Sequence, residues 1–438
     1  MKRFVRPGAF LLLAALLFCL SGCYSGNIDQ YFSLPMASEE YRQLQSLIDE
    51  ELASGSEYAA PIHGSYRQSV QLSDVDGDGA DEALAFFRDA AKNPKINIYD
   101  SENGEYRLAL SISGEGSSIG RIDYADLTGD GQKELLVSWQ ISSGLSVLGV
   151  YSLAGWSGDV LLSTDSAEFV TGDINRDGCD ELLNLRAANS TTYLVDQYTF
   201  PLGQEPQATS AALSAGISAL QRLRMVTLAG DAPALLAEST LTTGDLVSDL
   251  FVCRDGSLIN LTMNRTTQIS ETRRSYSLVY AQDIDGDGST EIPHPQQLYS
   301  RGDEVFWSIA WFRYDASGRA STIMTTYHCV TDNWYLVLPS GWDVGLTVRR
   351  DDSVSGKRAV ILSRLRSDGS LEDYVAVYAI TGENRYERAR LDNRFLLQEE
   401  GTTVYAAKIL DGKTDENTIR SRFHVIYTDW SSGSVVGG

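Results

Sequence analysis

Histidine and cysteine are the scarce reactive residues of this 438-residue chain, which has four of the first and five of the second. The histidines are His63, His294, His328 and His424. None belongs to a His-x-x-x-His or His-Glu-x-x-His pattern, and no Cys-x-x-Cys pair occurs. The Gly-x-Ser-x-Gly spacing is met once, at residues 116–120, but no helix pattern follows it as in a nucleophile elbow. These absences argue against a helix-borne zinc hydrolase, a serine hydrolase and a paired-cysteine zinc site. We therefore expect no catalytic residues.

Basic residues are also few, since 36 lysines and arginines stand against 59 aspartates and glutamates, for a formal net charge of −23. So acidic a surface is a poor partner for nucleic acid, because phosphate contacts need clustered basic side chains. Hydrophobic residues make up 43% of the chain, which supports a globular core. The composition predicts a folded, acidic protein that does not bind nucleic acid.

The N-terminus has the pattern of a targeting signal. Three basic residues precede an apolar stretch, residues 9–20, that is too short for a comfortable membrane span. The next residues, Leu20-Ser21-Gly22-Cys23, resemble the lipobox of bacterial lipoproteins. This resemblance implies cleavage after residue 22 and lipid on the Cys23 thiol, which would anchor an extracytoplasmic protein to the bacterial cell membrane. A plain secretory signal and a single anchor helix are the alternatives.

The signal peptide is expected over residues 1–22, a polar tether over residues 23–37 and a helix over residues 38–55. Ser38 can cap this helix, and Gly55 can end it. The apolar residues that share one helical face are Tyr41, Leu44, Leu47, Ile48 and Leu52. We expect this face to pack on the main fold, with a partner-binding helix as the alternative.

Three cysteines remain once Cys19 leaves with the signal and Cys23 takes lipid, namely Cys179, Cys253 and Cys329. Three widely spaced thiols cannot form a complete disulfide framework. We expect unreactive thiols, and one pair with one free thiol stays open.

An acidic pattern, Asp-x-Asp-Gly-Asp-Gly-x-x-Glu or a close variant, occurs four times, over residues 74–82, 126–134, 173–181 and 283–291. Oxygen-bearing side chains stand at positions 1, 3, 5 and 9, and glycine at position 6 permits the tight turn. These side chains are Asp74, Asp76, Asp78 and Glu82; Asp126, Thr128, Asp130 and Glu134; Asp173, Asn175, Asp177 and Glu181; Asp283, Asp285, Asp287 and Glu291. Such spacing lets a short loop wrap a hard cation that takes six to eight oxygens, so we expect up to four calcium ions.

The spacing of the copies predicts a repeat architecture. Loops begin at residues 74, 126, 173 and 283, and a degenerate copy near residue 227 keeps only Asp231 as a ligand side chain. A period near fifty residues is typical of propeller blades. Short strand-like runs flank each loop, so we expect four-stranded antiparallel blades closed in a ring over residues 56–330.

These motifs resemble the FG-GAP or VCBS repeats of bacterial surface proteins, which are similar to the repeats of integrin α-chain propellers. The resemblance covers about residues 60–300 and implies an all-β, calcium-bearing β-propeller. It also implies a fifth ligand in each loop, the position-7 backbone carbonyl of Ala80, Gln132, Cys179 or Ser289. Thr128 and Asn175 replace aspartate at position 3, so their sites should bind calcium more weakly.

The acidic loops stop after about residue 300, but short strand signals continue to residue 428. Residues 331–438 are therefore expected to form a separate β-rich module, or else two degenerate blades that would close a seven-bladed ring.

Propellers host many functions, so the repeats name no substrate. We expect a monomeric, calcium-stabilised, lipid-anchored scaffold that binds a protein or a glycan on its propeller face. A carbohydrate-active enzyme and an envelope assembly factor are the alternatives.

Overall fold

The computed structural model describes residues 39–102 and 104–427, and within them the regular structure is mostly β-strand with few helices. The expected signal peptide, the tether and Cys23 lie outside these residues. The expected N-terminal helix is present as α3 (Glu39–Ala53). No helix in the described part is long and apolar enough to cross a membrane.

Four antiparallel sheets of blade type follow α3, each with its strands in sequence order except for an extra edge strand in the first. Sheet one has β1 (Glu57–Tyr58), β2 (Val70–Ser73), β3 (Glu82–Arg88), β4 (Pro94–Glu102) and β5 (Glu105–Ser113). Sheet two has β6 (Ser118–Ala125), β7 (Glu134–Ser142), β8 (Leu145–Tyr151) and β9 (Val160–Ser166). Sheet three has β10 (Glu168–Gly172), β11 (Glu181–Ala187), β12 (Tyr193–Thr199) and β13 (Gln207–Ala212). Sheet four has β14 (Ile217–Leu228), β15 (Ala232–Leu241), β16 (Leu246–Arg254) and β17 (Ser257–Asn260).

Two further sheets form the C-terminal part, after a small hairpin of β18 (Met263–Asn264) and β19 (Ile269–Ser270). Sheet five has β20 (Glu291–Gln297), β21 (Trp307–Tyr314), β22 (Ala320–Cys329), β23 (Trp334–Val337) and β29 (Phe423–Val425). Sheet six has β24 (Leu346–Val354), β25 (Lys357–Leu365), β26 (Leu371–Ile380), β27 (Phe395–Glu400) and β28 (Thr403–Ile409). The helices of this region are α4 (Arg385–Arg388) and α5 (Glu416–Arg420).

Each sheet buries apolar side chains against the next sheet, so the cores lie between consecutive sheets. Leu84 of sheet one and Leu135 of sheet two share one core, and Leu136 and Leu182 join sheets two and three. The strands that carry these residues are buried on both faces, as their continuous apolar runs indicate. Sandwiched sheets of this kind are how propeller blades protect their faces from water.

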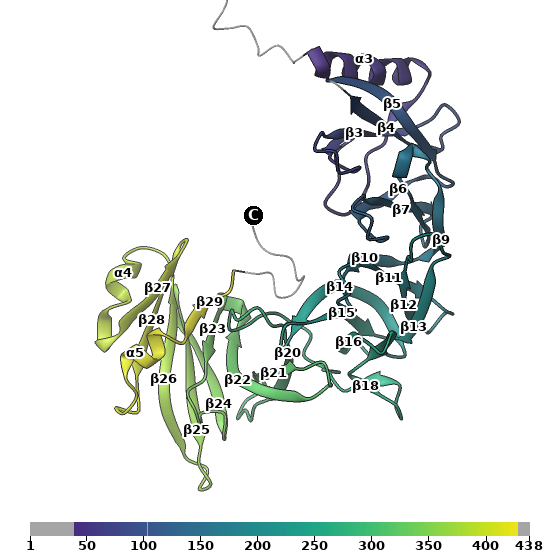
Figure 1. Ribbon diagram of the computed structural model, residues 1–438. Coiled ribbons are helices and arrows are strands. Elements are labelled where there is room, and N and C mark those ends of the chain that lie inside the picture. Colours follow the sequence, from purple (N-terminus) through teal and green to yellow (C-terminus); the bar gives the residue numbers. More distant parts are fainter. Residues whose placement is uncertain (1–38, 103, 428–438) are drawn as a thin grey trace, which may run out of the picture.

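The six sheets follow one another along an open arc, with sheets one and six at its opposite ends (Figure 1). The outer face of sheet one is covered by α3, because Leu44 and Ile48 pack with Phe87 and Tyr99. The outer face of sheet six carries a small core that includes Ala389, the residue after α4. Blade-like sheets and a short N-terminal helix are thus confirmed. The expected ring closure is not seen, because both faces that would meet are covered.

The C-terminal strand returns to an earlier sheet. β29 pairs with β23, so it completes sheet five after the chain has already built sheet six. One large core joins these two sheets and includes Trp334, Leu362 and Phe423. Residue 331, the expected domain boundary, falls inside sheet five, between β22 and β23.

The degenerate repeat is also present as a hairpin. β14 and β15 are joined by residues 229–231 alone, and Asp231 adopts a positive φ of 58° there. This turn is too short to wrap an ion.

Candidate metal site

The four acidic loops occupy the same place in their sheets. In sheets one to three the loop joins consecutive strands, β2 to β3, β6 to β7 and β10 to β11, and before β20 the preceding strand is reduced to the single bridge Gln282–Glu291. The glutamate at position 9 begins the second strand each time and is at most 3% exposed. Its Oε2 accepts the backbone N–H of position 2, at 2.9 Å from Val75, 2.8 Å from Leu127, 3.1 Å from Ile174 and 3.1 Å from Ile284.

Backbone N–H groups also hold the aspartates in place. Asp74 Oδ1 accepts from Gly77 at 2.8 Å and its Oδ2 from Gly79 at 3.2 Å, and the position-1 aspartates of loops two and four accept in the same way. In loop three Asp173 Oδ1 accepts from the N–H of Asp177 instead, and Oδ2 from Gly178. The position-5 aspartate accepts the N–H of position 7, as in Asp78 and Ala80 at 2.7 Å. These short-range bonds shape the loop, and they engage both oxygens of the position-1 aspartate and one oxygen of the position-5 aspartate.

Neighbouring loops are joined edge to edge. The N–H of Lys133 donates to the Val75 carbonyl at 3.1 Å, and the N–H of Asp180 donates to the Asp126 carbonyl at 3.3 Å. The Lys133 ammonium group donates to the Asp74 carbonyl at 2.9 Å. Loops one to three therefore lie in one row.

Loop one, residues 74–82, has the arrangement that best fits a calcium ion. Carboxylate oxygens of Asp74, Asp76 and Asp78 lie within 4.8 Å of one another, as do those of Asp76, Glu82 and Asp100. Glu82 is 0% exposed, yet its Oε1 accepts no hydrogen bond from the described residues. A buried carboxylate oxygen without a partner, facing other carboxylates, is the feature that a hard cation would satisfy.

The pKa of the position-9 glutamate reflects this crowding. Burial raises the pKa of Glu82 to about 7, and the negative charges of Asp76 and Asp78 add to the rise. Burial raises the pKa of Glu134 and of Glu181 to about 7 in the same way. Without a cation, the surroundings of each of these glutamates thus disfavour the ionised form of its carboxyl group.

Loops two and three place neutral side chains among their carboxylates. Thr128 Oγ1 donates to Glu134 Oε1 at 3.4 Å. Asn175 Nδ2 donates to Asp177 Oδ2 at 2.9 Å and also to Glu181 Oε1. The Asn175 amide therefore presents a donor where a metal would need an oxygen, so this side chain would have to turn before an ion binds.

Loop four, residues 283–291, contains a cation of its own. The Arg313 side chain forms three ion pairs, at 2.7 Å with Asp285, 2.8 Å with Asp287 and 2.7 Å with Glu291. Asp283, Asp285 and Glu291 do bring their oxygens together. In the structure the guanidinium lies among these carboxylates, at the site expected to hold calcium through Asp283, Asp285, Asp287, Ser289 and Glu291.

Sequence reasoning missed Asp100 and Arg313, which lie on the strand after the loop's second strand. They stand 18 and 22 residues beyond Glu82 and Glu291, and only the hairpin register brings them back. The remaining cysteines, Cys179, Cys253 and Cys329, are all free thiols, and Cys329 is buried.

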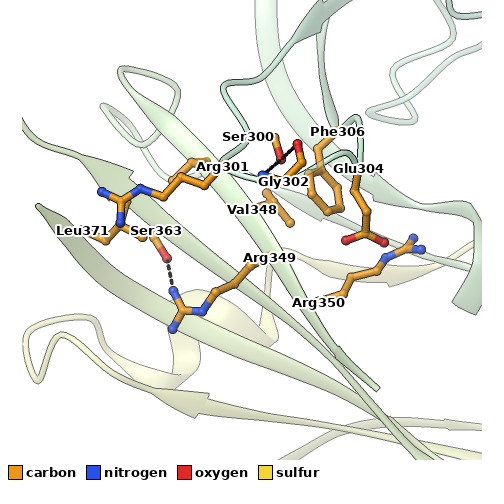
Figure 2. Close-up of a pocket in the computed structure, with 11 residues that line it drawn as sticks. Ser300, Arg301, Gly302, Glu304, Phe306, Val348, Arg349, Arg350, Ser363 and Leu371 are labelled. Carbon is orange, nitrogen blue, oxygen red and sulfur yellow. Dashed lines mark hydrogen bonds between the residues drawn. The ribbon is translucent and has the colours of Figure 1, made fainter. Parts of the chain in front are cut away.

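A second candidate site is a cavity of about 200 Å³ between sheets five and six. Figure 2 shows Arg301, Arg349 and Arg350 around it, with Glu304 near Arg350. Arg349 is bound to Asp373 at 2.7 and 2.6 Å and to Ser363 at 3.1 Å, so its charge is offset. Arg301 and Arg350 have no salt bridge among the described residues and hydrogen bond to Gly369 and Thr331 respectively.

Fold and site together define an all-β protein of stacked blade-like sheets with acidic loops along one row. No family model and no curated protein matches the chain. Among solved structures, it is similar to a protein of Bacteroides fragilis and one of Bacteroides uniformis, both named provisionally as 6-phosphogluconolactonases. The first is 11% identical with a TM-score of 0.27, over 73% of this chain and 92% of that chain. The second is 12% identical with a TM-score of 0.28, over 73% and 94%. Similarity at this level carries no argument about activity.

Proposed function

We propose that this chain is a calcium-stabilised, lipid-anchored extracytoplasmic protein that binds a ligand and performs no catalysis. One observation carries the calcium part, namely the buried Glu82 carboxylate, whose Oε1 has no hydrogen-bond partner among the described residues and which lies with Asp76 and Asp100, oxygen to oxygen, within 4.8 Å. A calcium ion there would bind to oxygens of loop one and tie β2 to β3. Calcium supplies charge neutralisation and a fixed geometry to such a loop, while the N–H groups of Gly77, Gly79 and Ala80 hold the carboxylates.

Calcium in this role is structural. Binding to the folded loop and not to the open chain raises stability by mass action. Sites in extracellular modules bind at about 0.1 to 1 mM, which suits a protein outside the cytoplasm. The lipid on Cys23 and the cleavage after residue 22 remain part of this proposal and rest on the N-terminal sequence.

The ligand, a protein or a glycan, would bring an anionic group to the cavity between sheets five and six. Arg301 and Arg350 line it and have no carboxylate salt bridge in the described part, in a chain whose net charge is −23. Guanidinium groups bind carboxylate and sulfate oxygens in two-point contacts. The chain's own acidity would disfavour anions elsewhere on the surface.

Calorimetric titration of the purified full chain with calcium, and separately with magnesium, tests the metal part. We expect calcium binding at 0.1 to 1 mM, much weaker magnesium binding, and a loss of the tightest site in Glu82→Gln. Absence of heat and of any thermal stabilisation with calcium would refute it.

Binding of uronate-containing oligosaccharides and acidic peptides, against neutral oligosaccharides, tests the ligand part. Arg301→Ala should weaken binding to the anionic probe, and Arg366→Ala, an exposed arginine paired with Glu372 outside this cavity, should not. Turnover of an oligosaccharide would favour the carbohydrate-active enzyme instead. Binding only to envelope proteins would favour the assembly factor.

A further inference from the structure

The charge at one backbone position varies among the acidic loops. It lies directly across from the position-9 glutamate, near or just beyond the end of the strand that pairs with the glutamate's strand and follows it in the chain. The register Ala83–Tyr99 places Asp100 opposite Glu82, and Glu291 pairs with Arg313. The corresponding registers of sheets two and three place Ser152 opposite Glu134 and Thr199 opposite Glu181. The position is thus acidic at loop one, neutral at loops two and three, and basic at loop four.

At loop one this position adds a carboxylate from outside the nine-residue motif. Asp100 is 6% exposed and lies with Asp76 and Glu82 within 4.8 Å, oxygen to oxygen. Arg107 binds Asp100 Oδ2 at 2.8 Å from the solvent side, with its own side chain 61% exposed. Since Arg107 contacts one oxygen, the other can face the loop. Calcium affinity rises with the number of charged ligands, so a fifth carboxylate strengthens this loop above the others.

At loop four the same position supplies a permanent cation. The guanidinium of Arg313 is always protonated and fills the space between three carboxylates, with a side chain only 20% exposed. A calcium ion would have to displace it and leave a positive charge beside a divalent ion. The planar fork of arginine also satisfies the carboxylate oxygens that calcium would use.

We propose that the residue opposite the position-9 glutamate decides which loops take calcium. Asp100 is a calcium ligand that makes loop one the tightest site, and Arg313 replaces the ion in loop four. The inference deepens the proposed function and rests on it for loop one. The chain then binds at most three calcium ions, and in loop four the Arg313 guanidinium takes the place of the fourth.

Equilibrium binding of radioactive calcium to the purified full chain tests this directly. The wild type should bind no more than three ions per chain. Asp100→Asn should weaken the tightest site at least tenfold without a change in their number. Arg313→Ala should add one ion, and the double variant Arg313→Ala with Asp287→Asn should lose it again. Arg313→Lys keeps a cation at the loop and should not gain an ion.

Circular dichroism of each variant in calcium reports whether it folds, and Arg313→Gln replaces Arg313→Ala if the alanine variant does not. Four ions in the wild type, or no added ion in a folded Arg313 variant, would overturn the assignment of loop four. An unchanged tightest site in Asp100→Asn would overturn that of loop one. If the wild type binds no calcium and Arg313→Ala binds one ion, the proposed calcium-stabilised function is refuted. The inference that Arg313 excludes calcium from loop four would still stand.

Discussion

Arg274 and Glu238 form an ion pair inside the protein, with Arg274 Nη2 3.0 Å from Glu238 Oε1 and the side chains 2% and 0% exposed. Glu238 Oε1 also accepts from Ser248 Oγ at 2.9 Å and from the N–H of Ala281 at 3.1 Å. The pair joins sheet four, whose loop has lost its ligands, to the segment that leads into loop four. A buried ion pair thus connects sheet four to the segment that follows it. In the first three repeats the corresponding place is taken by an acidic loop.

Removal of Arg274 should be severe. Arg274→Met leaves the buried Glu238 with one cation, Arg222, whose Nη1 lies 3.3 Å from Glu238 Oε2. The loss of one partner of a buried pair destabilises by up to about 3 to 5 kcal/mol. Urea unfolding in saturating calcium measures this. The double variant Arg274→Met with Glu238→Gln should recover part of the loss, and the exposed pair variant Arg366→Met should change stability by less than about 1 kcal/mol. Equal losses in both arginine variants would contradict the role of the buried pair.

Asp78→Ala and Asp287→Ala should differ in their response to calcium. Asp78→Ala removes a ligand of loop one, so at calcium tenfold above the dissociation constant it should forfeit about 1.4 kcal/mol of stabilisation. Asp287 binds Arg313, so its replacement should lower stability equally with and without calcium. Thermal unfolding of both variants, in chelator and in calcium, measures how much calcium raises the melting temperature of each. A calcium response lost in Asp287→Ala but kept in Asp78→Ala would reverse the assignment of the loops.

Acid should destabilise the protein partly through His328. Burial lowers the pKa of this imidazole to about 3, and it lies between Trp311, 6.0 Å away, and Tyr335, 5.2 Å away, measured between ring centres. The folded-state pKa is below the ordinary value of about 6.5, so the stability that neutral His328 contributes is present above pH 6.5 and falls as the pH drops toward 3. At pH 5 the loss relative to pH 7 should be about 2 kcal/mol.

His328→Phe keeps an aromatic ring in this place and cannot titrate. The difference in unfolding free energy between pH 7 and pH 5 should therefore be about 2 kcal/mol smaller in this variant than in the wild type. Identical pH dependence in the two proteins would show that His328 does not contribute.

Cys23→Ala should release the protein from the membrane, because the lipid anchor is expected on that thiol. Fractionation of expressing cells, with detergent partition of the membrane fraction, measures the change. Cys253→Ala, which removes a free thiol inside a strand, is the matched control and should stay on the membrane. Membrane association of Cys23→Ala as strong as that of the wild type would favour an anchor helix.

Local features of the chain were predictable from sequence, and those set by distant pairing were not. The aspartates of loop one lie within nine residues, so their spacing alone brings them together. Asp100 and Arg313 enter through hairpin register, which no motif encodes. The helical face of Leu44 and Ile48 was evident, but not that it would cover sheet one and oppose ring closure. The return of β29 to β23 depends on the pairs Trp334–Val425 and Tyr335–His424, which are 91 and 89 residues apart in the chain.

The central claim, that calcium occupies loop one and holds the fold, is tested most directly by thermal unfolding of the purified protein in excess chelator and then across a calcium series. The account predicts that the melting temperature climbs through about 0.1 to 1 mM calcium, responds much less to magnesium, and that the climb is reduced in Glu82→Gln. A melting temperature that does not change with calcium would contradict it.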